Sequence, residues 1–280
     1  MDARVLDGRA IAGELAASLA ERASALRGRG VVPVLATVGI GEDPTALSYD
    51  RVLRRGAGRV GVDFRGDPLP SGSGAERVAE RLRGLSADPS VHGVMLHSPL
   101  PAGLDHAELA ASIAPGKDVD GAGPASAARL LLGRPGFVPA TAAAVLEILG
   151  RAGVPLEGAR AVVVGRSLVV GKPAALLLLA ANATVTVCHS RTRGLAGIAA
   201  EADVLVVAAG RPRLIGPEAV KPGATVVDVG TTSTEGGMVG DVDFEAVARV
   251  AGAITPVPGG VGPVTTMSLL RQTLDAAERA

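Results

Sequence analysis

The segment from Ala161 to Pro173, AVVVGRSLVVGKP, carries the clearest chemical pattern in this sequence. An apolar run typical of a strand buried on both faces ends at Gly165, and a helix-forming run begins just beyond Gly171. Glycine permits positive φ and close backbone approach, and the free amides at a helix start attract phosphate through the helix dipole. The pattern therefore indicates a dinucleotide. Because Ser167 replaces the middle glycine of GxGxxG, a tight strand-to-helix turn that binds nothing fits equally well.

A second group of polar residues follows the next strand of this half. Folds that bind NAD usually place Asp or Glu about twenty residues after the glycines. Here the hydroxyl of Ser190 and the guanidinium of Arg191 stand at that place, and Arg166 lies in the first loop. Arginine binds phosphate in a bidentate manner, so these residues favour a 2′-phosphate and hence NADP over NAD. The alternative is that both arginines are solvated surface charges.

The loop TPVPGGVGPVT, from Thr255 to Thr265, has the chemistry to approach flat rings closely. Two prolines fix φ on either side of Val257, and the glycines let the backbone bend tightly. Such a loop can lie between a cofactor and a substrate, although an ordinary tight crossover has the same composition. Its candidate contact residues are Pro258, Gly259 and Gly260.

The elements of the N-terminal half alternate between helices and strands. Such alternation favours a parallel sheet with helices on its faces. A Gly/Pro segment, LLGRPGFVPA, then marks a candidate domain boundary. The expected helices span 8–27, 46–55, 74–85, 105–113 and 125–132, and the expected strands span 32–38, 62–64 and 91–96.

The second half alternates again and predicts a Rossmann-like, doubly wound parallel sheet, with ligands at the carboxyl ends of its strands. The expected helices span 141–152, 173–181 and 193–200, and the expected strands span 160–164, 184–187, 204–208 and 225–229. Gly165, Ser190, Gly210 and Gly230 each follow one of these strands. Each alone is explained as a turn residue, but four at one edge favour a site. The fold class is thus α/β with two domains.

Composition limits the classes of partner. At 280 residues the chain is long enough for about two domains. Lys and Arg together number 28, as do Asp and Glu, so no basic face indicates nucleic acid. The segment MDARVLDGRAIAGEL is too charged for a signal peptide, and no apolar run reaches the roughly 18 residues of a membrane-spanning helix. We therefore expect a cytoplasmic protein with small-molecule partners, neither nucleic acid nor membrane.

Cysteine and histidine patterns indicate neither a disulfide nor a metal site. Cys188 is the single cysteine, which excludes an internal disulfide and a multi-thiolate site. The 4 histidines have no HExxH or similar ligand spacing. No metal is predicted.

Several motifs occur together and in order along the chain: DGRAIA from Asp7, GKDVDG at 116–121, GRSLVVGKP at 165–173, CHSRT at 188–192, GDVDF at 240–244 and TPVPGGVGPVT at 255–265. On these motifs the chain resembles the FolD family, the bifunctional methylenetetrahydrofolate dehydrogenase/cyclohydrolases. The resemblance implies a folate-binding catalytic domain over 1–138, completed by a last helix over 263–280 that packs back on it. It also implies an NADP-binding domain over 139–262 and a homodimer.

The activity that the resemblance implies is NADP-dependent oxidation of 5,10-methylenetetrahydrofolate, followed by hydrolysis of the methenyl product to 10-formyltetrahydrofolate. By matching positions, Tyr49 and Asp120 line the folate pocket. A carboxylate such as Asp120 can pair with the amino and ring N–H edge of a pterin, although a turn Asp has the same sequence context. The residues implied to contact NADP are Gly165, Arg166, Ser167, Ser190 and Thr231.

The sequence departs from the family near the folate pocket. The family carries a lysine four residues after the tyrosine, where this chain has Leu53 after Tyr49. Leucine cannot manage protons during hydrolysis. The family's QLPLP segment reads HSPLP, so His97 takes the glutamine position, and a histidine titrating near neutrality is a possible replacement base. The catalytic candidates are Tyr49, His97 and Asp120.

These departures leave three hypotheses open. The first is an enzyme that retains both steps, with His97 in place of the lysine. The second is a protein that retains the dehydrogenase step only, because hydride transfer depends mainly on positioning two bound partners, or a paralogue with a changed folate or related substrate. The third is a noncatalytic NADP-binding protein.

Overall fold

The computed structural model describes residues 2–280, which divide into two compact units. Unit 1 comprises the described residues up to Ala12 together with Thr141–Thr265, and unit 2 comprises Gly13–Ala140 with Thr266–Ala280. The break near residue 140 lies close to the boundary expected from the Gly/Pro segment. The first residues belong to unit 1 rather than to the N-terminal unit, because strand β1 (Arg4–Val5) pairs in parallel with β11 (Ala253–Ile254).

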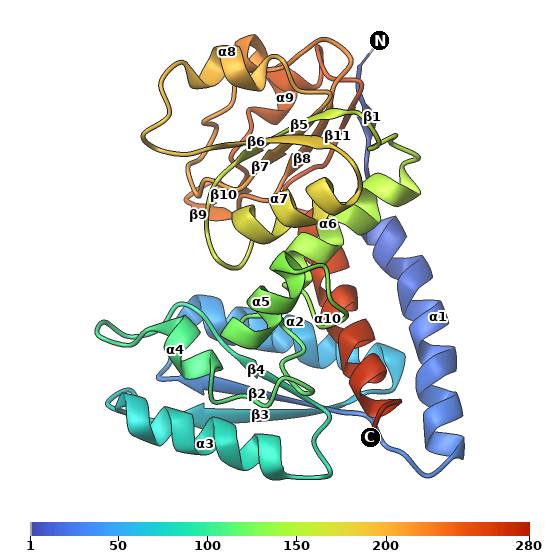
Figure 1. Ribbon diagram of the computed structural model, residues 1–280, viewed down its shortest axis with the longest axis vertical. Coiled ribbons are helices and arrows are strands. Elements are labelled where there is room, and N and C mark those ends of the chain that lie inside the picture. Colours follow the sequence, from blue (N-terminus) through green and yellow to red (C-terminus); the bar gives the residue numbers. More distant parts are fainter. Residues whose placement is uncertain (1) are drawn as a thin grey trace. The chain divides into compact units, whose positions relative to one another are not determined.

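Unit 1 is built on a parallel sheet of six strands in the order β1-β11-β8-β7-β5-β6. The chain passes from β5 through α7 to the outer strand β6, then reverses through α8 to β7, so it is doubly wound; α7 and α8 lie on opposite faces of the sheet (Figure 1). This confirms the fold class expected from the sequence. The remaining bounds in unit 1 are β5 (Arg160–Val164), β6 (Thr184–Cys188), β7 (Val204–Val207), β8 (Thr225–Asp228), the hairpin β9 (Thr232–Thr234) and β10 (Gly237–Val239), α6 (Ala140–Arg151), α7 (Gly171–Ala180), α8 (Leu195–Ala199), the 3-10 turn η1 (Pro217–Ala219) and α9 (Phe244–Val247).

The core of unit 1 explains why these segments are strands. All four residues of β7 and of β8 are buried, as are the last four of β5, so their Val-rich runs face helices on both sides. Leu205, Val226 and Ile254 contribute to one continuous apolar cluster in this unit. The rigid strands thereby bring their carboxyl ends to one edge of the sheet.

Unit 2 is built on a parallel sheet of three strands in the order β3-β2-β4. Helices α2 and α3 lie on opposite faces of this sheet (Figure 1). Val38, Val78, Leu96 and Leu109 belong to one buried cluster that joins the sheet to α3 and α4. The bounds in unit 2 are β2 (Val34–Ile40), β3 (Asp63–Leu69), β4 (Gly93–Leu96), α2 (Pro44–Val60), α3 (Ala75–Ala87), α4 (His106–Ala110) and α5 (Pro124–Leu131), while α1 (Gly8–Gly28) and α10 (Val261–Ala277) each contribute residues to both units.

The end of α10 packs within unit 2, as the expected last helix should. Gln272 is buried, and its Nε2 donates to the carbonyls of Val119 at 2.8 Å and Val138 at 2.9 Å. Its Oε1 accepts from the Val138 N–H at 3.0 Å. A Cβ built on Gly56 of α2 would lie 2.8 Å from the Thr266 side chain, so α10 and α2 touch closely.

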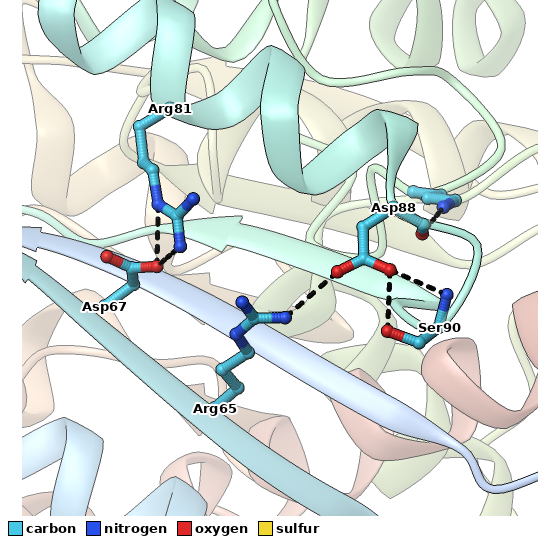
Figure 2. A network of polar contacts seen from close by, with 6 residues as sticks. Arg65, Asp67, Arg81, Asp88 and Ser90 are labelled. Carbon is cyan, nitrogen blue, oxygen red and sulfur yellow. Dashed lines mark hydrogen bonds and ion pairs between the residues drawn. The ribbon is translucent and has the colours of Figure 1, made fainter.

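Strand β3 is an edge strand whose polar side chains are held by ion pairs. Figure 2 shows Arg65 paired with Asp88, Nη1 to Oδ2 at 3.0 Å, and Arg81 of α3 paired with Asp67. Asp88 also accepts from the Ser90 hydroxyl at 2.6 Å and the Ser90 amide at 2.9 Å. The charges tie the strand to α3 and the following turn while leaving its outer edge polar.

Some elements differ from the sequence expectations. The β3 strand extends to Leu69, well beyond the expected 62–64, because an edge strand tolerates Gly66 and Pro68. Strands β1 and β11 have two residues each, too few for any period to show. Within residues 2–280, no helix has the length and apolarity needed to cross a membrane, and no His, Cys, Asp and Glu side chains gather as a metal site would require.

Candidate active site

The turn between β5 and α7 can exist only with glycine at two positions. Gly165 has φ 138°, and a Cβ placed on it would lie 2.2 Å from the Ala208 carbonyl oxygen. A Cβ on Gly171 would lie 2.3 Å from the Gly165 carbonyl oxygen. The backbone therefore folds back on itself at the start of α7, as a loop that approaches phosphate must.

Ser167 completes this turn from inside. Its Oγ accepts hydrogen bonds from the amides of Val170 at 3.2 Å and Gly171 at 3.3 Å. The Lys172 amide donates to the Ser167 carbonyl at 3.1 Å. Replacing the middle glycine of the fingerprint by serine thus supplies a hydroxyl acceptor for the amides at the start of α7 and leaves the exposed Arg166 beside it.

The loop after β6 presents the residues expected at a 2′-phosphate. The Thr192 Oγ1 accepts from the His189 amide at 2.8 Å, and the His189 Nδ1 accepts from the Arg191 amide at 3.2 Å. These local bonds fix the loop while Ser190 and Arg191 stay exposed. Within residues 2–280, the guanidiniums of Arg166 and Arg191 make no hydrogen bond or ion pair. Both remain available to an anion.

Two buried aspartates, whose function the sequence did not reveal, hold the loops after β7 and β8. Asp241 Oδ2 accepts from the amides of Ala209 at 2.6 Å and Gly210 at 2.8 Å. Asp228 accepts from the amides of Gly230 at 2.9 Å and Asp241 at 3.0 Å. Burial raises the pKa of Asp228 to about 6. The GDVDF motif is therefore a support for the cofactor edge, beside which Thr231 is exposed.

The loop before α10 is compressed against the rest of unit 1. A Cβ on Gly260 would lie 2.5 Å from the Pro256 carbonyl oxygen, and one on Gly8 would lie 1.7 Å from the Gly260 carbonyl oxygen. Gly259 has φ 111° and Pro258 is exposed. Contacts within unit 1 therefore already require the glycines of this loop, so the glycines alone do not indicate a ligand.

In unit 2, Tyr49 joins two other predicted site residues. Its ring makes an edge contact with the His97 ring, with centroids 6.1 Å apart and planes at 89°. Burial and the nearby Asp120 carboxylate both raise the pKa of Tyr49. Tyr49 lies on α2, His97 follows β4, and Asp120 lies in the GKDVDG loop, so three distant segments converge.

Helix α2 is positioned firmly enough to present Tyr49. Asp43 caps it by accepting from the amides of Thr45 at 2.9 Å and Ala46 at 3.0 Å. It ends at Gly61 in the left-handed conformation with φ 79°. Leu53, at the position of the family lysine, is fully buried at 0% exposure. The helix thus offers an apolar anchor where the family has an amine.

Asp120 differs from its neighbour Asp118 in having few hydrogen-bond donors. Asp118 is buried and accepts from Gly123 N at 2.9 Å, Ala122 N at 3.1 Å and the Ser126 hydroxyl at 2.6 Å. Burial and the Asp118 charge raise the pKa of Asp120 to about 7, against the effect of one bond from the Ala140 amide. Asp118 therefore has a structural role. Asp120 is a carboxyl group that titrates near neutrality and has room to accept hydrogen bonds from a ligand.

His97 has a carboxylate partner that the sequence did not reveal. His97 Nε2 lies 3.2 Å from Asp50 Oδ1, which also accepts from the Thr37 hydroxyl at 2.9 Å. The other ring nitrogen, Nδ1, is buried and has no hydrogen-bond partner within residues 2–280. In the sequence, Asp50 and Arg54 have the i,i+4 spacing of an ordinary surface ion pair, and the structure contains that pair at 3.7 Å. Nothing in this spacing indicates that the other carboxylate oxygen of Asp50 contacts His97.

Comparison with known proteins covers both halves of the chain. A family model described as "Tetrahydrofolate dehydrogenase/cyclohydrolase, catalytic domain" matches residues 6–120. A second, described as "Tetrahydrofolate dehydrogenase/cyclohydrolase, NAD(P)-binding domain", matches residues 139–280. The "Bifunctional protein FolD" of Parafrankia sp. (strain EAN1pec) is 56% identical over 279 residues, covering 98% of this chain and 99% of that protein. That of Roseiflexus sp. (strain RS-1) is 49% identical over 281 residues, covering 100% and 98%.

Solved structures agree with these matches. The bifunctional FolD enzyme of Campylobacter jejuni superposes with a TM-score of 0.96 at 37% identity, covering 98% of each chain. The Trypanosoma brucei FolD enzyme, solved with NADP cofactor and inhibitor, superposes with a TM-score of 0.95 at 38% identity, covering 100% of this chain and 98% of that one. The chain belongs to the tetrahydrofolate dehydrogenase/cyclohydrolase family, known as FolD.

Proposed function

We propose that this protein is an NADP-dependent 5,10-methylenetetrahydrofolate dehydrogenase that also hydrolyses its methenyl product to 10-formyltetrahydrofolate. The observation that carries the proposal is the convergence of Tyr49, His97 and Asp120 in a chain that matches both FolD domain models. Membership of the family over nearly the whole length does not favour a noncatalytic NADP-binding protein.

The residues present fit NADP at the edge of the unit 1 sheet. The turn closed by Gly165, Ser167 and Gly171 would hold the pyrophosphate, and the unpaired Arg166 and Arg191 with Ser190 would suit a 2′-phosphate. Thr231 adds an exposed hydroxyl in the segment that follows β8. Once bound, NADP supplies the nicotinamide carbon that accepts the hydride.

In unit 2, the polar residues suit a reduced pterin. We assign Asp120 to the amino and ring N–H edge, because it is a carboxyl group with few donors of its own. Tyr49 offers an aromatic face beside it. Pro258, Gly259 and Gly260 remain proposed contacts with the substrate, supported by the resemblance and by the exposure of Pro258.

Hydrolysis requires a group that takes a proton from water. Leu53 cannot do so, and arginine is a poor proton acceptor, which excludes Arg54. Because Asp120 is assigned to the pterin edge, we take His97 as the base, and its Nδ1 has no hydrogen-bond partner within the described chain. Burial lowers the pKa of His97, with Asp50 acting in the opposite direction, so the neutral ring is favoured at physiological pH.

One spectrophotometric assay tests the proposal. Purified protein is mixed with methylenetetrahydrofolate and NADP while NADPH and methenyl absorbance are followed together. We expect NADPH to form, and methenyl product to disappear faster than it does in buffer. Absence of NADPH formation would contradict the dehydrogenase assignment, and the mutant His97→Gln should keep NADPH formation while losing the accelerated hydrolysis.

We further propose a homodimer. The open edge of β3 and the exposed apolar side chains Leu47 and Val52 on α2 support it, at 45% and 41% exposure. Light scattering after size exclusion tests it, and Val52→Glu should shift a dimer toward monomer. A cytoplasmic location and the absence of nucleic-acid binding stay predictions, testable by fractionation and by a mobility-shift assay.

A further inference from the structure

Asp50 and His97 form a carboxylate and imidazole pair inside unit 2. Asp50 lies on α2 and His97 follows β4, and their side chains meet at 3.2 Å between Oδ1 and Nε2. The His97 side chain is 4% exposed and that of Asp50 is 24% exposed. Asp50 therefore contacts a buried ring while reaching the surface of the unit.

The surroundings fix the role of each oxygen of Asp50. Oδ1 accepts from the Thr37 hydroxyl at 2.9 Å, and Thr37 is itself buried. Oδ2 faces Arg54 at 3.7 Å. Asp50 also lines an open hollow of about 540 Å³ with Glu42, Pro44, Leu47, Arg51 and Arg54. The Asp50 carboxylate has no proton to donate, so its contact with His97 is a hydrogen bond that the carboxylate accepts.

Because the Asp50 carboxylate accepts a hydrogen bond from Nε2, it determines which ring nitrogen of His97 carries the proton. The ring must carry its proton on Nε2, so Nδ1 holds the free lone pair. That nitrogen is buried and unpaired within residues 2–280. The ring is oriented beside Tyr49, and its Cδ2 atom lies 3.7 Å from a Cβ built on Gly39. The lone pair of Nδ1 is thus the one hydrogen-bonding position of the ring that has no partner among the described residues.

We propose that Asp50 is the positioning residue of the hydrolytic step, which it serves by holding His97 as the Nε2–H tautomer so that Nδ1 accepts the proton of the attacking water. The proposal rests on the proposed function. The water O–H bond breaks, its proton passes to Nδ1, and the oxygen bonds to the methenyl carbon, whose C=N electron pair moves to nitrogen. Collapse then breaks the bond to N5: Nδ1 returns its proton to N5, the hydroxyl proton leaves to solvent, and 10-formyltetrahydrofolate remains.

Asp50→Asn is the test, because an amide preserves shape but can donate to Nε2 and so transfer the ring proton to Nδ1. Hydrolysis is measured from methenyltetrahydrofolate supplied directly, and NADP reduction is measured separately. We expect the kcat of hydrolysis to fall about 100-fold, the scale of general-base catalysis, while the kcat of NADP reduction stays near that of the wild type. Arg51→Ala, on the same turn of α2 and exposed, is the matched control and should leave both rates unchanged.

Two further measurements separate positioning from a structural role. ¹⁵N NMR of the His97 ring should show the Nε2–H tautomer in the wild type and the Nδ1–H tautomer in Asp50→Asn. Because the pair acts as a unit, His97→Gln with Asp50→Asn should hydrolyse no more slowly than His97→Gln alone.

Three results would overturn the inference: an Nδ1–H tautomer in the wild type, hydrolysis at the wild-type rate in Asp50→Asn, or methenyl consumption by the wild type no faster than in buffer. The last two leave the dehydrogenase assignment standing if NADPH still forms. Failure of NADPH formation alone would instead reject the dehydrogenase step, while the direct hydrolysis assay and the NMR tautomer still decide the role of Asp50.

Discussion

The protonation of Asp120 should make folate binding depend on pH, with binding weakened as pH falls. Burial and the Asp118 charge raise the pKa of Asp120 from 3.8 to about 7, so the free enzyme is largely protonated at this site below neutrality. Only the carboxylate accepts from the amino and ring N–H edge of a pterin. Binding must therefore strengthen as pH rises through about 7 and weaken as pH falls.

The size of the effect follows from the titration curve. For a pKa near 7, about a tenth of the molecules carry the carboxylate at pH 6 and about nine tenths at pH 8, so kcat/KM for the folate should rise about tenfold over that interval. The same shift has a thermodynamic counterpart. Because the folded pKa is raised, the contribution of Asp120 to the stability of the free protein is greatest below about pH 3.8 and falls as pH rises toward 7.

Initial rates of NADP reduction between pH 5.5 and 8.5 at limiting folate give the profile. Asp120→Asn cannot ionise and should have low kcat/KM with no step near neutrality. Asp63→Asn, a substitution of a surface carboxylate whose side chain is 60% exposed, is the matched control and should retain the wild-type profile. A wild-type profile that is flat from pH 6 to 8, or a step that persists in Asp120→Asn, would refute the reasoning, since another group would then control binding.

Three further predictions concern the cofactor edge and the last helix. Arg191→Ala removes a charge-assisted phosphate contact and should raise the KM for NADP about 10- to 100-fold while leaving that for NAD nearly unchanged; equal loss with both cofactors would contradict a 2′-phosphate contact. Gly171→Ala places a Cβ 2.3 Å from the Gly165 carbonyl oxygen, so calorimetry should detect no NADP binding at concentrations that saturate the wild type; retained affinity would mean that the turn relaxes. Gln272→Ala leaves Val119 and Val138 backbone groups unpaired and should lower the free energy of unfolding in urea by about 3 kcal/mol, and a loss below measurement error would show that water replaces the amide.

More of the fold of unit 1 than of unit 2 could be predicted from the sequence. The apolar run before Gly165 and the Leu-rich run after Gly171 are long enough to predict β5 and α7. The glycine pattern also predicts the tight turn, but it does not reveal that the Ser167 hydroxyl accepts from the Val170 and Gly171 amides. Those hydrogen bonds depend on backbone positions that only the folded turn determines.

The site in unit 2 could be predicted only in part from the sequence, for a different reason. Tyr49 stands out because aromatic residues are scarce, and Asp120 through the GKDVDG resemblance. Asp50 carries no such signal, since its spacing to Arg54 is that of any solvated helical pair. Its contact with His97 joins residues 47 positions apart in the chain, and no local pattern encodes such a contact.

The interleaved composition of the two units has a consequence for biosynthesis. Unit 1 needs β1 (Arg4–Val5), which pairs with β11, and all of its residues have been synthesised once Thr265 has been added. Unit 2 waits for the closing stretch Thr266–Ala280, which brings the Gln272 contacts. On the ribosome, unit 1 can therefore mature first, whereas the unit that bears Tyr49 and Asp120 cannot be completed until Thr266–Ala280 has been added, so a nascent chain stalled at Thr265 should bind NADP before it can bind folate.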